Sequence, residues 1–183
     1  EKDGLLKIKD DEVRRNPFKN LDIERSKPFD LTEYQQTVFE PVSQALKDDS
    51  YNSFLLHGVT GSGKTEIYIH LALQSIAAGK QVLILIPELS LTPQFVRRYF
   101  SVFGDKLAVL HSGLPLGQRT DEWNRVRRGE ADIVLGTRLS IFAPLKNPGL
   151  IIVDEEHDQS YKQDDYPIFH ARDVAVVRAN MNK

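Results

Sequence analysis

The chain of 183 residues is long enough for one domain with its own hydrophobic core, and its 40% hydrophobic and 27% charged residues are typical of globular proteins. It has no cysteine, which excludes disulfides and cysteine-ligated zinc, and with no signal-peptide pattern we expect a cytoplasmic protein. The net charge of −2 gives no bulk attraction to nucleic acid, and no apolar run approaches the ~20 residues that cross a bilayer, so no membrane partner is expected.

The first 28 residues are rich in charge and poor in apolar side chains. We therefore interpret residues 1–28 as a linker or the tail of a preceding domain, and residues 29–183 as one domain. The chain begins with Glu1 rather than Met, and no obvious terminus marks its end at Lys183. We expect a fragment of a larger protein.

A helix is expected to begin at Thr32. Its hydroxyl suits the N-cap, and Gln35, three residues later, would complete a capping box. The functional alternative is that the amide of Gln35 or Gln36 reads the edge of an adenine, although spacing alone favours the cap. Pro41 is expected to kink this helix or to force a restart.

A phosphate-binding pattern follows. The apolar run Phe54–Leu56, expected to be a strand, leads into Gly-x-x-x-x-Gly-Lys-Thr at residues 58–65, and a helical pattern follows over 66–78. The backbone N–H groups of such a loop and the positive end of the helix behind it form an anion site. Lys64 would reach the terminal phosphates, and the Thr65 hydroxyl would ligate Mg²⁺. A glycine-rich turn before an ordinary helix is the alternative.

Short apolar segments then alternate with helical patterns. Gln81–Ile86 is too continuously apolar for an open antiparallel edge and suits a parallel strand covered on both faces. Further strands are expected at 107–110, 131–135 and 150–153. This alternation predicts an α/β fold, a mostly parallel sheet with helices on both faces.

Two more helices are expected between these strands. Thr92 and Pro93 would begin the first, in which apolar residues repeat at helical spacing up to position 103. The second covers 115–128. Its predicted inward-facing residues are Leu116, Trp123 and Val126, and its arginines at 125, 127 and 128 lie near the C-terminal end, where cations are favoured.

A second chemical signal lies at the end of the last strand, in Asp154-Glu155-Glu156-His157. Carboxylates at the carboxyl end of a parallel strand are placed to face a ligand. Asp154 would hold Mg²⁺ together with Thr65, and Glu155 would polarise the water that attacks the γ-phosphate. A solvated acidic loop is the alternative, which the phosphate loop upstream disfavours.

These motifs together carry a resemblance. Asp-Glu-x-His after a phosphate loop resembles the motor core of superfamily 2 helicases. Several stretches are similar to the PriA family of primosomal replication-restart DNA helicases, over roughly residues 29–180. They are 58–68, 86–94, 136–138 with 142–144, 154–163 and 170–173.

The resemblance implies the first RecA-like lobe of a helicase motor, with ATP and Mg²⁺ as cofactors and no zinc in this segment. The implied ATP-binding residues are Gln35, Gly58, Thr60, Gly61, Ser62, Gly63, Lys64 and Thr65. The implied catalytic residues are Lys64, Asp154, Glu155 and His157, and the implied metal ligands are Thr65 and Asp154. His157 stands where the family links the state of the ATP to DNA and to the second lobe.

The same resemblance implies contacts with single-stranded DNA. Thr92, Thr137 and Arg138 match motifs that hold the DNA backbone, and such donors position a strand without reading its sequence. The alternatives are a plain N-cap for Thr92 and a surface ion pair for Arg138.

An aromatic and basic loop, residues 161–172, is implied to couple DNA binding to hydrolysis. Tyr161, Lys162 and Phe169 are its expected DNA contacts, because aromatic faces stack on unpaired bases of any identity. The alternative is that some of these rings pin the loop to the core. The chain departs from the family at Ile168, where an arginine is usual.

The implied function is ATP-driven 3′-to-5′ movement on single-stranded or forked DNA in replication restart. The implied partners are the second RecA-like lobe of the same chain, and primosome and single-strand-binding proteins that would bind through other domains. One alternative is a nucleotide-binding module, since the arginine of the second lobe lies outside this segment and the lobe alone should hydrolyse ATP poorly. Another is a different superfamily 2 translocase, which would lack the 161–163 and 170–173 matches.

Overall fold

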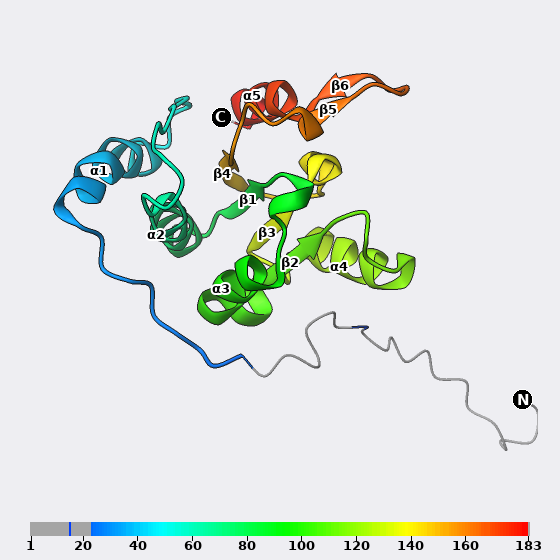
Figure 1. The fold of residues 1–183 in the computed structure, drawn as a ribbon, viewed down its shortest axis with the longest axis horizontal. Helices are drawn as coiled ribbons and strands as arrows, with labels where there is room; N and C mark the ends of the chain where they lie inside the picture. The colour runs from blue at the N-terminus through cyan, green and yellow to red at the C-terminus, as the bar shows by residue number, and fades with distance from the viewer. Residues whose placement is uncertain (1–14, 16–22, 183) are drawn as a thin grey trace, which may run out of the picture.

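The computed structural model describes residue 15 and residues 23–182, so most of the expected linker lies outside the described residues (Figure 1). The helices are α1 (Glu33–Lys47), α2 (Lys64–Ala77), α3 (Pro93–Phe103), α4 (Leu116–Arg128) and α5 (Ala171–Met181). The strands are β1 (Gln81–Leu85), β2 (Leu107–Leu110), β3 (Ile133–Gly136), β4 (Pro148–Val153), β5 (Lys162–Gln163) and β6 (Phe169–His170). Short 3-10 turns include η1 (Glu88–Ser90), η3 (Arg138–Phe142) and η4 (Gln159–Tyr161).

The central sheet has four parallel strands in the order β2-β3-β1-β4. Leu83 in the middle of β1 lies opposite Val134 of β3 and Ile151 of β4. Every residue of β1 is buried, which is the pattern of a parallel strand covered on both faces. The α/β class predicted from the sequence is confirmed, as are these four strands.

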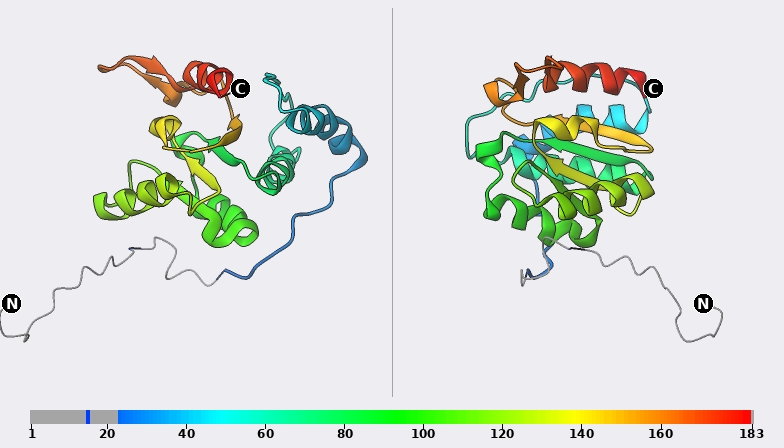
Figure 2. Two further views of the ribbon diagram at one scale, coloured as in Figure 1. Left: turned by 180° about the vertical axis from the view of Figure 1, so that it is seen from behind. Right: turned by 90° about the vertical axis from the view of Figure 1, so that its right-hand side faces the viewer.

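Alternation along β1 divides the core into two layers. Val82 and Ile84 face a cluster that includes side chains of α2 and α3, whereas Leu83 and Leu85 face a cluster that includes side chains of α4 and α5. Figures 1 and 2 show these helix pairs on opposite sides of the sheet, with α1 outside α2. The carboxyl ends of the parallel strands therefore meet at one edge, the usual place for a ligand in such a sheet.

The run Phe54–Leu56 is not a strand, contrary to the sequence prediction. Phe54 and Leu55 are 49% and 79% exposed, and no described strand pairs with the edge of β4 that β1 leaves open. A strand needs a hydrogen-bonded neighbour as well as apolar side chains, and three apolar residues are a weak signal without one.

The first helix continues through Pro41 as a single element, so of the two expected effects the restart is wrong, and the kink stays a prediction. Proline removes the hydrogen bond to the carbonyl of Thr37. Both residues are exposed, which leaves that carbonyl free to bind solvent. The capping box predicted from Thr32 and Gln35 is confirmed, with both of its hydrogen bonds present.

The predicted inward face of α4 is wrong at two of three positions. Val126 is buried, but Leu116 is 70% and Trp123 is 37% exposed. Arg125 is in the last turn of the helix, as expected, but it is buried beside Glu122, with Nη1 and Oε2 2.8 Å apart, and it also donates to the Leu107 carbonyl. A buried ion pair on this face turns Trp123 away from the sheet.

Part of the segment expected to be a loop, residues 161–172, has regular structure, because β5 and β6 form a short antiparallel hairpin. The connection between the two strands consists of residues 164–168. Among the described helices, none is long and apolar enough to cross a membrane.

Candidate functional site

The phosphate loop, residues 58–65, ends at the first turn of α2. Gly61 and Gly63 have φ angles of 82° and 83°, values that side chains with a Cβ rarely adopt. Gly63 is the N-cap of α2, and a Cβ there would lie 2.3 Å from the amide nitrogen of Gln35. Backbone conformation therefore favours glycine at both positions, and Gly63 in addition lies against the Gln35 side chain of α1.

The ammonium group of Lys64 joins this loop to the acidic motif. Its Nζ donates to the carbonyl of Gly58 at 2.7 Å and lies 3.6 Å from a carboxylate oxygen of Glu155. The loop and the Asp154–Glu155 pair, 90 residues apart in the sequence, thus meet at one point. The structure brings together the two motifs that the sequence analysis combined.

Asp154 is nearly buried, at 9% exposure, and the hydroxyl of Tyr68 donates to its Oδ1 at 3.1 Å. Burial raises the pKa of this carboxyl, and the charge of Glu155 raises it further, while the Tyr68 hydrogen bond and the charge of Lys64 oppose the rise. Burial and the neighbouring Asp154 charge raise the pKa of Tyr68 far above its usual range, which keeps its hydroxyl a donor.

The backbone turns sharply at Glu155, whose φ of 44° is unusual for a residue other than glycine. Such strain persists only where the surroundings impose it, and it is concentrated at functional sites. The exposed imidazole of His157 places its Nε2 3.9 Å from Oε2 of Glu155. The turn therefore directs Glu155 toward Lys64 on one side and His157 on the other.

Gln35 serves the capping box and also contacts the phosphate loop. Its Oε1 accepts from the Thr32 N–H at 2.9 Å, and its Nε2 donates to the Ser62 carbonyl at 3.1 Å. The same amide is thus adjacent to the loop, where a bound nucleotide would lie. Its role in reading adenine remains a proposal.

The residues present fit Mg²⁺ bound with a nucleotide. No cluster of three or more histidine, aspartate or glutamate side chains able to hold a metal occurs among the described residues. Mg²⁺ does not need one, because it keeps several waters and takes one or two protein oxygens plus phosphates. The nearly buried carboxylate of Asp154, unfavourable in isolation, suits a divalent cation.

Two residues that support the site were not assigned from the sequence, although a signal existed for one of them, Tyr68. Tyr68 lies four residues after Lys64, on the same face of α2, which predicts contact with the same ligand-facing region. Glu66 is the other. Its carboxylate binds Arg98 of α3 at 2.8 Å and accepts from the N–H of Phe29 at 2.6 Å, and it thereby ties the first turn of α2 to its neighbours.

The expected DNA-contacting residues differ in their surroundings. Thr92 is exposed and caps α3, with its Oγ1 accepting from the N–H of Phe95. Thr137 is nearly buried, where β3 ends. Arg138 begins η3 and donates from Nη1 to the carbonyl of Lys162, while its buried Nε has no hydrogen-bond partner in the described part of the chain. The surface ion pair considered for Arg138 is not formed.

Tyr161 cannot stack on a base in this structure, which corrects the expectation for that residue. It is wholly buried, and its hydroxyl donates to the Asp154 carbonyl at 2.7 Å. Phe169 is half-buried against Phe142, with ring centroids 5.2 Å apart in an edge-to-face arrangement. Both rings hold the hairpin to the core, whereas Lys162 is exposed and paired with Asp164.

Comparisons with known proteins match one family over most of the chain. The family model for the DEAD/DEAH box helicase matches residues 32–174. The chain is 48% identical to replication restart protein PriA of Bacillus subtilis over 176 residues, 96% of this chain and 22% of that protein. It is 51% identical to replication restart protein PriA of Haemophilus influenzae over 137 residues, 75% of this chain and 19% of that protein.

One solved structure, that of RecG bound to a three-way DNA junction, superposes with a TM-score of 0.63. It is 30% identical and covers 72% of this chain and 19% of that chain. The matches confirm the RecA-like fold and the family resemblance found in the motifs. The chain spans about a fifth of the length of the curated relatives it matches.

Proposed function

The chain belongs to the DEAD/DEAH box helicase family, and we propose that it is the ATP-binding motor lobe of a PriA-type DNA helicase that acts in replication restart. The observation that carries this proposal is the 3.6 Å approach of Lys64 to Glu155, which assembles the phosphate loop and the acidic motif into one site. Membership of the family implies the use of ATP with Mg²⁺.

In this site each group has a separate task. Lys64 exchanges its loop carbonyl for the terminal phosphates, and the loop N–H groups bind the remaining phosphate oxygens. Glu155 orients the attacking water. Asp154 and Thr65 would hold Mg²⁺, which would supply positive charge next to the phosphates. Tyr68 keeps the Asp154 carboxylate directed at the nucleotide.

The DNA partner is proposed to lie at the neighbouring ends of β1 and β3. Thr92, Thr137 and Arg138 follow those strands and offer hydroxyl and guanidinium donors for a phosphate backbone. RecG, the structural neighbour, binds a three-way junction, and PriA proteins are named for replication restart. We therefore propose 3′-to-5′ translocation on single-stranded or forked DNA.

The lobe alone is proposed to bind nucleotide weakly and to hydrolyse it slowly. In this class of motor an arginine from a second lobe stabilises the transition state, and such arginines contribute about 10³–10⁵ in rate. The second lobe, and the partners named in the sequence analysis, belong to the remainder of the protein.

The test is steady-state ATPase activity of the full-length protein and of the 183-residue chain, each with and without single-stranded DNA. Turnover of the full-length protein should rise strongly with DNA, whereas the chain should stay near its basal rate. DNA-stimulated turnover of several per second from the chain alone would contradict the two-lobe assignment. A full-length protein without DNA-stimulated turnover would contradict the motor assignment.

A further inference from the structure

A pocket of about 330 Å³ lies beside the nucleotide site, where β2 and β3 end. It is at the small end of the ~300–1,000 Å³ range of ligand pockets, a size for a single ring system rather than a peptide. One wall is apolar and is formed by Leu110, Trp123 and Leu139. The remainder of the lining is polar, so the pocket is amphipathic: it consists of Arg119, Arg138, His111, Glu88 and the hydroxyl residues Ser112, Thr137, Ser140 and Ser160.

Trp123 has the exposure expected of a binding residue. It is one of the exposed large apolar side chains of α4 and lines this pocket, whereas Leu116 on the same helix is more exposed and does not. It is also the only tryptophan of the chain. The ion pair of Glu122 and Arg125 occupies the sheet-facing side of the helix, which leaves the indole on the pocket side.

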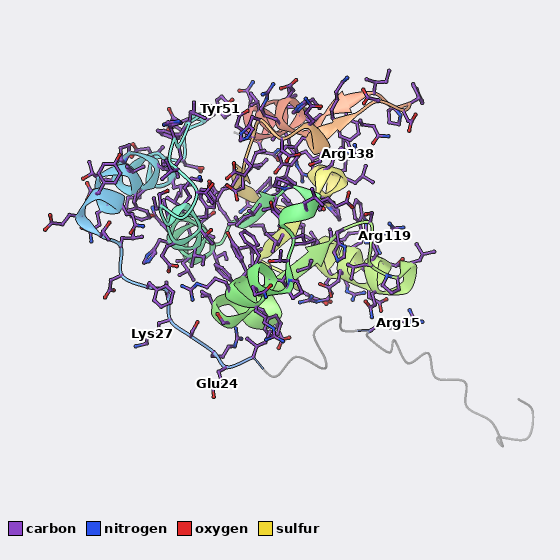
Figure 3. All side chains as sticks on the ribbon, in the orientation of Figure 1. Arg15, Glu24, Lys27, Tyr51, Arg119 and Arg138 are labelled. Carbon is purple, nitrogen blue, oxygen red and sulfur yellow. The ribbon has the colours of Figure 1, made fainter. Side chains whose placement is uncertain are left out.

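The charges of the pocket favour an anionic ligand. Arg119 has no side-chain hydrogen bond or ion pair among the described residues, and the buried Nε of Arg138 has no acceptor there. Figure 3 shows both arginines on the same side of the molecule, one from α4 and one from η3. The carboxylate that lines the pocket, Glu88, accepts a hydrogen bond from Ser112. The Arg119 guanidinium, and an Arg138 guanidinium with one of its donors unsatisfied, lie beside an indole, an arrangement that suits a phosphate attached to a planar base.

We propose that this pocket receives one unpaired base of single-stranded DNA, stacked on Trp123, with its phosphate bound by Arg119 and Arg138. The inference rests on the proposed function, because that function supplies the strand. It adds a base-binding subsite to residues otherwise expected to hold only the backbone. Stacking on a side chain is indifferent to base identity, which suits an enzyme that moves along any sequence.

The hydrogen bond from Arg138 to the Lys162 carbonyl connects the subsite to the nucleotide site through the backbone of residues 154–162. Lys162 begins β5 directly after Tyr161, whose hydroxyl binds the Asp154 carbonyl. A base and phosphate that reposition Arg138 would therefore act on the turn that carries Asp154 and Glu155.

The test uses the fluorescence of Trp123 in the 183-residue chain. Binding of an end-labelled oligothymidine is followed by anisotropy, and indole emission is followed in a parallel titration with unlabelled oligomer. Quenching with the same midpoint as the anisotropy change is expected. An oligomer of equal length with abasic sites should bind more weakly and leave the emission nearly unchanged, and inorganic phosphate should not quench it.

Variants complete the design. Trp123→Ala should weaken binding of oligothymidine by about tenfold or more, the order of one lost base–aromatic stack, while Trp123→Phe should retain most of the affinity. Leu116→Ala, an exposed apolar residue of the same helix outside the pocket, is the matched control and should bind as wild type.

The outcomes separate the two proposals. DNA binding without a change in indole emission, or equal quenching by the abasic oligomer, would overturn the base subsite and leave the proposed function standing. Absence of DNA binding by anisotropy would overturn DNA binding by this lobe and the subsite with it.

Discussion

Two regions at the same edge of the sheet differ in how their polar groups are satisfied. In the nucleotide site the functional side chains already bind one another: Lys64 approaches Glu155, and Tyr68 holds Asp154. In the Trp123 pocket, Arg119 and the Nε of Arg138 have no partner among the described residues. A nucleotide that binds the first region must replace contacts between protein side chains. A ligand of the second region can bind donors that have no partner among the described residues.

This difference has an energetic consequence. Opposite charges that pair in the unliganded nucleotide site lower the cost of burying them, and a nucleotide must compete with that pairing. The pocket carries less of this compensation, and one of its walls is apolar. We therefore expect changes in the nucleotide site to affect catalysis and stability strongly, and changes in the pocket to affect DNA affinity more than either.

The largest expected effect is the loss of ATP turnover on substitution of Glu155 in the nucleotide site. Glu155→Gln keeps the size and hydrogen bonding of the side chain but removes the charge that orients water. In the full-length protein ATP should still bind, while ATP turnover falls by orders of magnitude. Trp123→Phe is the control from the pocket and should keep basal turnover. Turnover within about twofold of wild type for Glu155→Gln would move the water-orienting role to another carboxylate, Glu156 first.

The connection between the regions is tested at Tyr161. Tyr161→Ala removes a fully buried ring and should lower the free energy of unfolding by about 3–5 kcal/mol, the usual cost of deleting a large aromatic residue from a core. Tyr161→Phe removes only the hydroxyl that binds the Asp154 carbonyl and should cost about 1–3 kcal/mol. Urea denaturation of the chain measures both. A small effect of Tyr161→Ala would mean that the ring is not part of the core and is available to DNA.

A smaller effect, of opposite sign, is expected at Asp154. Its raised pKa means that the folded chain binds this proton more tightly than the unfolded chain does, so its contribution to stability falls as pH rises above the usual value of 3.8. Asp154→Asn should therefore stabilise the unliganded chain at neutral pH, by about 2–4 °C in melting temperature for each kcal/mol gained. Asp173→Asn, an exposed carboxylate on α5, is the control. A lower melting temperature for Asp154→Asn would contradict the unfavourable burial of the charge.

The smallest expected effect belongs to the pocket. Burial lowers the pKa of His111 from its ordinary value of 6.5, with the charge of Glu88 opposing the shift. The unfolded chain therefore takes up this proton at a higher pH than the folded chain, and stability should decline as pH falls below about 6.5. His111→Asn should flatten this part of the profile of melting temperature against pH relative to the wild-type chain. An unchanged profile in His111→Asn would contradict the prediction.

The sequence predicted the regions unequally, for physical reasons. The phosphate loop, the four paired strands and the Asp154–Glu155 turn follow from local chemistry, in which glycine conformation and strand burial act over a few residues. The exposure of Trp123 depends on the burial of the Glu122–Arg125 pair on the sheet-facing side of the helix. Hydrophobic periodicity assigns apolar residues to the core and cannot predict that a charged pair is buried in their place. The burial of Tyr161 and the unpaired run Phe54–Leu56 depend on contacts distant in sequence, which spacing cannot show.

The central claim is that the loop at residues 58–65 and the Asp154–Glu155 turn form one nucleotide site. Calorimetric titration of the 183-residue chain with ATP and Mg²⁺ tests it most directly, using wild type, Lys64→Ala and the surface control Lys106→Ala, whose side chain pairs with Asp132 at 3.0 Å. Wild type and Lys106→Ala should bind with equal affinity, and Lys64→Ala should show no measurable binding while its melting curve remains cooperative. Equal nucleotide affinity in Lys64→Ala and wild type would contradict the claim.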